Sequence, residues 1–127
     1  MSKLVDRIKS GEFTLIAEIG VNYYDIAVQR GISNMDAAKL MCREAADAGI
    51  HAVKFQTYKA ETLAAAESPS YWTRGGAHHQ PTRVIQEVRF LWGDEYREIA
   101  ECCEKIGIDF CSTAFDFASA DYLESMM

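Results

Sequence analysis

Polar side chains interrupt three otherwise apolar segments of the sequence, each near the C-terminal end of its segment: Glu18, Lys54, Gln56, Ser112 and Thr113. Lys54 and Gln56 are two residues apart, so both side chains project from the same face if the segment is a strand. A lysine ammonium is a compact charge suited to a phosphate or a carboxylate, and a buried lysine must find an anion or lose its proton. The pattern therefore predicts a binding site for an anionic ligand around Lys54.

Purely structural interpretations exist for some of these residues. Glu18 and Lys54 could form an internal ion pair, although the desolvation of both charges makes such a pair a poor stabiliser. Asn22, just past the first apolar segment, could orient a substrate hydroxyl or form an Asx turn. The residue type leaves both alternatives for Asn22 open.

The elements that must position these side chains alternate between strands and helices. Short apolar segments, typical of strands covered on both faces, occupy residues 13–20, 52–57 and 108–113. Helical spacing and capping signals, including Ser33 and Asp116 as N-caps, predict helices over residues 33–49, 94–107 and 116–127.

Three strand–helix units in succession require a parallel sheet, because each crossover is a helix. A doubly wound sheet and a (β/α)8 barrel both satisfy this order. The first strand is not followed by a Gly-x-Gly-x-x-Gly fingerprint, and no Walker-type loop occurs, so the barrel is favoured. Since a whole barrel needs about 250 residues, residues 1–127 are expected to be the N-terminal part, about three βα units, of an α/β TIM barrel.

The composition excludes several classes of protein. The chain has 127 residues, 49% of them hydrophobic, and 13 Lys and Arg against 19 Asp and Glu give a net charge of −6. No basic run or stripe of arginine and aromatic residues is present, which argues against nucleic acid or an anionic membrane as a partner. Because no membrane helix or signal-peptide pattern occurs either, we expect a cytoplasmic protein.

Neither the cysteines nor the histidines have the spacing of a metal site. We expect reduced thiols, buried as small hydrophobic residues, at all four cysteines: Cys42, Cys102, Cys103 and Cys111. His51 directly precedes a strand. His78 and His79 fall in residues 58–92, where glycine and proline break any long element and predict a long functional loop.

Taken together, three blocks of sequence resemble successive blocks of the sialic acid synthase family: residues 17–22 (Ala-Glu-Ile-Gly-Val-Asn), residues 53–63 (Val-Lys-Phe-Gln-Thr, then Ala-Glu-Thr-Leu) and residues 107–116 (Gly-Ile-Asp-Phe-Cys-Ser-Thr-Ala-Phe-Asp). Residues 68–72 also resemble the bacterial branch that makes sialic or legionaminic acid. The resemblance implies a metal-dependent (β/α)8 barrel that condenses phosphoenolpyruvate with the aldehyde form of an N-acylated amino sugar and releases phosphate.

The resemblance also implies roles for individual residues. Lys54 matches the family's phosphoenolpyruvate-binding lysine, and Thr113 matches its phosphate-side threonine. Gln56 falls beside the metal and substrate, while Glu18 matches a glutamate assigned to acid–base or water-orienting work. A repeated Gly-Ile before the last two strands pairs Lys54 with Ser112 when its glycines are aligned. Neighbouring barrel strands contribute to different layers, so Thr113 is the first choice and Ser112 the second.

The chain departs from the family's pattern in two places. Residues 23–25 (Tyr-Tyr-Asp) replace the usual His-Asn-Gly after Asn22, which affects the expected sugar, and Ala114 replaces a proline. The family's metal-binding histidines, which would hold a divalent ion such as Mn²⁺ or Mg²⁺, and its antifreeze-like domain would lie beyond Met127. We therefore expect no metal ligand in residues 1–127 and no activity from this piece alone.

Two other functions remain possible from the sequence. One is a non-catalytic module, a truncated or degenerate barrel that self-associates through open sheet edges. The other is a different phosphoenolpyruvate-dependent synthase of sugar acids. In the favoured interpretation the partners are phosphoenolpyruvate and an amino sugar, and we expect a homo-oligomer.

Overall fold

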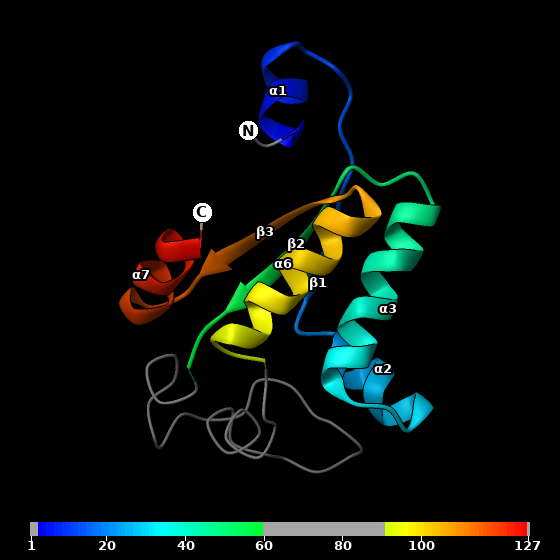
Figure 1. Cartoon of the computed structure of the whole chain (residues 1–127), viewed down its shortest axis with the longest axis vertical. Coiled ribbons are helices and arrows are strands. Elements are labelled where there is room, and N and C mark those ends of the chain that lie inside the picture. The colour runs from blue at the N-terminus through cyan, green and yellow to red at the C-terminus, as the bar shows by residue number, and fades with distance from the viewer. Residues whose placement is uncertain (1–2, 60–90, 127) are drawn as a thin grey trace, which may run out of the picture.

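The computed structural model describes residues 3–59 and 91–126. The elements occur in the order α1 (Lys3–Lys9), β1 (Ile16–Gly20), α2 (Tyr23–Arg30), α3 (Asn34–Asp47), β2 (Ala52–Thr57), α6 (Asp94–Ile106), β3 (Asp109–Ala114) and α7 (Phe117–Met126) (Figure 1). In this part of the chain the strands form one parallel sheet in the order β1-β2-β3. The pairing and the order agree with the sequence prediction.

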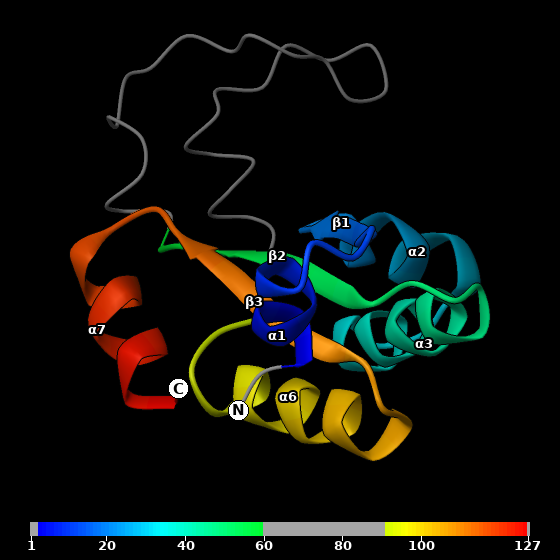
Figure 2. The same cartoon turned by 90° about the horizontal axis from the view of Figure 1, so that it is seen from above.

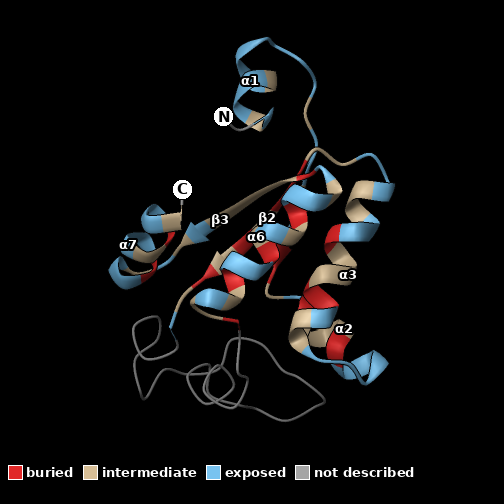
Figure 3. Cartoon of the chain, viewed as in Figure 1, coloured by how far each residue is buried: buried red, intermediate tan, exposed pale blue. Residues whose placement is uncertain are grey.

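One face of the sheet is covered by α3 and α6, which lie side by side beneath it (Figure 2). The central strand alternates accordingly: Val53, Phe55 and Thr57 are fully buried, whereas the residues between them are only partly buried. The ring of Phe55 lies 6.0 Å from that of Tyr96 on α6. The core therefore lies between β2 and these two helices, where Figure 3 shows most of the buried residues.

Local capping interactions fix the ends of the predicted helices. Ser33 Oγ accepts a hydrogen bond from Asp36 N at 3.0 Å, and Asp116 Oδ1 accepts one from Ser119 N at 2.7 Å. Gly107 adopts a left-handed conformation (φ +82°) and ends α6, so that β3 can begin two residues later. These caps confirm the sequence signals at Ser33 and Asp116.

The structure also contains two short helices that the sequence patterns did not predict. The segment after Asn22 forms α2, whose buried side chains, Tyr23 and Ala27, are one turn apart and too few to show a helical period. Helix α1 lies beyond the amino ends of the strands (Figure 1), where Leu4 N donates to Asp109 Oδ2 at 2.5 Å.

Other expectations need correction or lie outside the described residues. The first strand begins at Ile16 and not at Phe13, whose side chain is 78% exposed. Residues 60–90, which hold most of the predicted loop, His78, His79 and the family-like residues 60–63 and 68–72, are not among those described. Among the helices that the structure does describe, none has the length and apolar character needed to cross a membrane.

Candidate anion-binding site

The sheet register places most of the predicted site residues on one face. Glu18 of β1 pairs with Lys54 of β2, and Lys54 pairs in turn with Cys111 of β3. One step closer to the carboxyl ends, Gln56 pairs with Thr113. Paired residues of adjacent strands project to the same side, and side chains alternate along each strand. All five side chains therefore project from the face opposite α3 and α6.

Lys54 makes direct contact with residues on both neighbouring strands. Its ammonium forms an ion pair with the Glu18 carboxylate and donates a hydrogen bond to Thr113 Oγ1 at 3.3 Å. The side chains of Lys54 and Glu18 are 35% and 48% exposed. In the described residues this face of the sheet is therefore partly open. An anion can reach the ammonium from this side.

Ser112, the second choice for the phosphate contact, lies outside this group. Its hydroxyl lies 2.7 Å from that of Thr57, a fully buried residue, on the face that the helices cover. The reason is the register: the strands pair Lys54 with Cys111, whereas alignment of the two repeated glycines pairs Lys54 with Ser112. A shift of one residue turns every side chain to the other face.

The end of β1 closely approaches the side chain of Gln56. The pairing of β1 with β2 shifts by one residue between Glu18 and Gly20, and Gly20 is left-handed with φ +57°. A Cβ atom at Gly20 would lie 3.4 Å from Gln56 Cδ. Bulges of this kind re-aim side chains beside functional sites, and here the bulge confines the Gln56 amide on one side.

Two further residues lie around this face, Asn22 beyond the end of β1 and Cys111 on β3. Asn22 is exposed beyond the end of β1, and its side chain makes no capping bond to α2.

Cys111, expected in the core, is half-buried on the Lys54 face and donates to Val53 O at 3.3 Å. Burial raises the pKa of the Cys111 thiol, although Lys54 opposes the shift, so the thiol is neutral at pH 7. The sequence did contain a signal for this position. Cys111 lies two residues before Thr113, and side chains two residues apart on a strand project to the same face.

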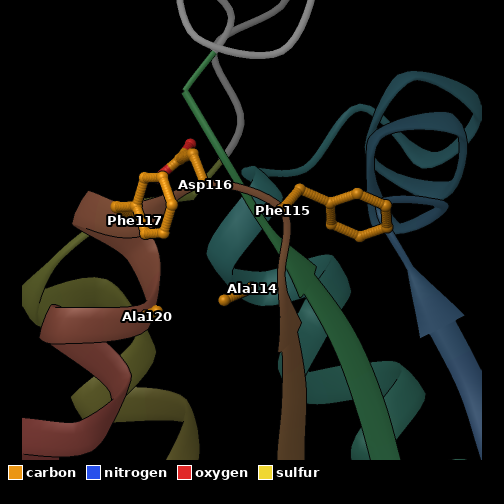
Figure 4. A pocket seen from close by; sticks show the side chains of 5 residues that line it. All are labelled: Ala114, Phe115, Asp116, Phe117 and Ala120. Carbon is orange, nitrogen blue, oxygen red and sulfur yellow. The ribbon is translucent and has the colours of Figure 1, made fainter.

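The structure has a separate hollow beside the carboxyl end of β3, between this strand and α7 (Figure 4). It has a volume of about 280 Å³ and is lined by Ala114, Phe115, Asp116, Phe117 and Ala120. Both oxygens of the Asp116 carboxylate already accept backbone hydrogen bonds, from Lys59 N and Ser119 N. The hollow contains none of the predicted site residues, so the candidate site is the open sheet face.

The described residues do not fit a divalent metal. Nowhere in residues 3–59 and 91–126 do three or more His, Cys, Asp or Glu side chains gather in a way that could hold an ion. Glu18 is engaged with Lys54. His51 lies at the opposite end of the sheet, where its Nδ1 accepts a hydrogen bond from Leu15 N at 2.9 Å.

Comparison with curated proteins identifies synthases as relatives. The N,N'-diacetyllegionaminic acid synthase of Legionella pneumophila is 31% identical over 114 residues, which is 88% of this chain and 30% of the relative. The N-acetylneuraminate-9-phosphate synthase of Drosophila melanogaster is 28% identical and matches 98% of this chain and 30% of its own length. The chain thus spans about 30% of the length of these relatives.

The fold has a counterpart among solved structures. The N-acetylneuraminic acid synthetase of Leptospira borgpetersenii, crystallised with citrate, superimposes with a TM-score of 0.64 at 26% identity, over 88% of this chain and 32% of that one. This match and the parallel sheet confirm the predicted fold class, an α/β part of a TIM barrel. A profile of the NeuB family matches residues 41–127. The chain belongs to the NeuB family.

Proposed function

We propose that this chain provides the phosphoenolpyruvate-binding face of a synthase of sialic-type acids. The enzyme would condense phosphoenolpyruvate with the aldehyde form of an N-acylated amino sugar and release phosphate. The observation that carries the proposal is the contact of the Lys54 ammonium with the Thr113 hydroxyl at 3.3 Å, on an open sheet face of a NeuB family member. Its relatives' names, legionaminic acid synthase among them, support the choice of product class.

Lys54 and Thr113 do binding and electrostatic work in this proposal. The ammonium takes a charge-assisted hydrogen bond from a phosphate or carboxylate oxygen of the substrate, and the Thr113 hydroxyl donates to the same group. The Glu18 carboxylate, which pairs with Lys54, gives up this partner to the substrate and stays beside the site in contact with water, to which its side chain is 48% exposed. Exchange of one anion for another keeps the ammonium paired throughout.

The reaction requires the addition of water, and we assign the proton of this water to Glu18. Carbon 3 of the enol attacks the aldehyde carbon, and the cation left at carbon 2 is captured by water. Glu18 accepts the proton that this water loses, and the aldehyde oxygen takes up one proton to become a hydroxyl. In the tetrahedral species the bond from carbon 2 to the phosphate oxygen then breaks as the carbon 2 hydroxyl becomes a ketone, and its proton leaves with the phosphate. Gln56, on the same face, holds a substrate hydroxyl through its amide, which is positioning work.

A divalent ion, Mn²⁺ or Mg²⁺, would polarise the sugar aldehyde when bound. Its protein ligands would come from outside the described residues, and none of the roles given to Lys54, Thr113, Glu18 or Gln56 depends on it.

A phosphate-release assay tests the proposal. The full-length protein is incubated with phosphoenolpyruvate, Mn²⁺ and N-acylated amino sugars, and both free phosphate and the acid product are measured. We expect phosphate only when phosphoenolpyruvate and a sugar are both present. Release without a sugar, or no release with any N-acylated amino sugar, contradicts a synthase of this class.

One observation favours a second candidate function, a module that self-associates. In the described residues β1 is an edge strand of the sheet. Exposed apolar residues lie at its first residue and just before it: Phe13 (78%), Leu15 (43%) and Ile16 (45%). Exposed apolar residues on an edge strand favour pairing with another chain. Sedimentation velocity of the wild type and of Phe13→Ser tests this: an oligomer that the substitution dissociates, without any phosphate release, favours the module.

A further inference from the structure

We propose that Tyr23 and Tyr96 form a buried positioning device for the candidate site, which holds the carboxyl end of β2 and thereby the side chain of Gln56. The inference rests on the proposed function, because it assigns Gln56 to the substrate. Neither tyrosine lies on the open face, so both would act on the reaction through Gln56 alone.

The two tyrosines connect segments that are far apart in the sequence. Tyr96 Oη donates a hydrogen bond to Gln56 O at 2.8 Å, and Tyr23 Oη accepts one from Leu91 N at 3.1 Å. Both rings also pack against Phe55 of β2, whose centroid lies 6.1 Å from that of Tyr23 and 6.0 Å from that of Tyr96. Both tyrosines are 0% exposed. Through this pair, α2, α6, the end of β2 and the chain at Leu91, three residues before α6, are held together inside the core.

Each of the two hydroxyls satisfies a buried backbone group. A phenol donates one hydrogen bond, and that of Tyr96 goes to Gln56 O. Leu91 N has the Tyr23 hydroxyl as its acceptor. A buried polar group that loses its partner costs free energy, so both contacts favour one arrangement of these segments.

The carbonyl of Gln56 needs this support because β1 ends beside it. Successive carbonyl groups along a strand point alternately to its two neighbouring strands. Thr57 O accepts a hydrogen bond from Phe115 N, on the β3 side. Gln56 O therefore points to the β1 side, where the ladder stops at Gly20. Tyr96 supplies the donor there, while Gly20 confines the Gln56 amide. Backbone and side chain of Gln56 are thus both held.

The test compares Tyr96→Phe with Ile99→Val in the full-length protein. The phenylalanine keeps the ring and removes the hydroxyl that donates to Gln56 O. Ile99 is fully buried on the same helix, and its substitution is a control for a general loss of core stability. We expect Tyr96→Phe to lower kcat by about 10- to 100-fold, as small misplacements do, with an unchanged KM for phosphoenolpyruvate. Ile99→Val should lower Tm and leave kcat unchanged.

A second readout is independent of turnover. In NMR spectra, the side-chain amide signals of Gln56 should shift in Tyr96→Phe and remain in place in Ile99→Val. If the wild type shows no synthase activity, the proposed function fails, whereas the Gln56 signals still decide the positioning claim. Should Tyr96→Phe not fold, Tyr23→Phe, which keeps the donor to Gln56 O, should show smaller changes in the same direction. Unmoved Gln56 signals, or a kcat equal to that of Ile99→Val, overturn the proposal.

Discussion

Lys54 contacts both of its neighbouring strands: its ammonium pairs with Glu18 on β1 and lies 3.3 Å from Thr113 Oγ1 on β3. Because β2 is the central strand of the sheet in the described residues, the positive charge lies near the middle of the open face. An anion that replaces the Glu18 carboxylate meets the ammonium and the threonine hydroxyl together. Recognition of a phosphate or carboxylate group follows from this arrangement of one cation between two polar side chains.

Lys54→Met should abolish turnover and leave the fold intact. Loss of a charge-assisted contact costs about 1.5–3 kcal/mol, roughly ten- to a hundredfold in binding, and more if the contact also aligns the substrate. The Glu18 partner is 48% exposed, so loss of the pair should cost less than about 1 kcal/mol of stability. Phosphate-release kinetics and thermal unfolding on the same samples measure both effects.

The matched control for this prediction is Lys39→Met. Lys39 also forms an ion pair, with Glu98, but lies on α3, away from the open face of the sheet. It should keep wild-type kinetics. A Lys54→Met protein with unchanged phosphoenolpyruvate kinetics would remove the role that we assign to Lys54, and a loss of 3–5 kcal/mol in stability, on the order seen for broken buried pairs, would show a structural pair instead.

Thr113 and Ser112 should have opposite effects when substituted. Thr113→Val removes a hydroxyl from the open face, and we expect phosphoenolpyruvate to bind about two- to tenfold more weakly with little change in Tm. Ser112→Ala removes the hydrogen-bond partner of the buried Thr57 hydroxyl and should cost about 1–3 kcal/mol of stability without weakening the binding of phosphoenolpyruvate. Calorimetric titration and urea unfolding of both variants check this; the reverse pattern would show that the register does not decide which residue binds.

Local signals explain how much of the fold was predictable. Residues 52–57 and 94–106 were predicted almost to their ends, because an apolar run or an apolar stripe and a terminal glycine mark them in the sequence. The Ser33 cap is equally local, since its partner Asp36 is three residues away. These elements, with the order of the strands, suffice to put polar residues of neighbouring strands near one another.

The choice between Ser112 and Thr113 depends on contacts that the sequence does not mark. The hydrogen bond from Asp109 N to His51 O sets the register of β3, and its two residues are far apart in the chain. The repeated glycines differ from that register by one residue, which is enough to exchange the two faces. Helix α2 was missed for a similar reason: Tyr23 is buried by Phe55 and by the chain at Leu91, not by a local pattern.

Gly20→Ala should destabilise the chain and disturb Gln56. An alanine at φ +57° costs roughly 1–2 kcal/mol in backbone strain. Its Cβ atom would also lie 3.4 Å from Gln56 Cδ, in direct contact with the amide that we assign to the substrate. Urea unfolding should show the loss, and kcat should fall while the KM for phosphoenolpyruvate is retained.

The control for Gly20→Ala is Gly31→Ala. Gly31 has a similar φ of +64° at the end of α2, but a Cβ atom there would meet nothing within 4 Å. It should show the same backbone cost with no change in kcat. Equal kcat values for the two variants would mean that the approach of Gly20 to Gln56 has no functional effect.

The buried tyrosines should make stability fall at alkaline pH. Burial raises the pKa of Tyr23 and of Tyr96 above the ordinary value of 10.0. Below pH 10 each tyrosine is neutral in both the folded and the unfolded chain, so its contribution to stability is fully present. Above pH 10 the unfolded chain ionises while the folded core does not. The free energy of unfolding is therefore lost as pH rises from 10 through the folded pKa, by up to about 1.4 kcal/mol per pH unit and per tyrosine.

Tyr23→Phe separates this titration from a general loss of stability. The variant should be less stable than the wild type at pH 8, because Leu91 N loses its acceptor. Between pH 10 and pH 11 its free energy of unfolding should fall less steeply, because one of the two buried phenols no longer ionises in the unfolded chain. Ile99→Val should also be less stable at pH 8 but should keep the wild-type slope. Urea unfolding at pH 8, 10 and 11 measures all three proteins, and a wild-type slope in Tyr23→Phe would show that this phenol is not held neutral in the core.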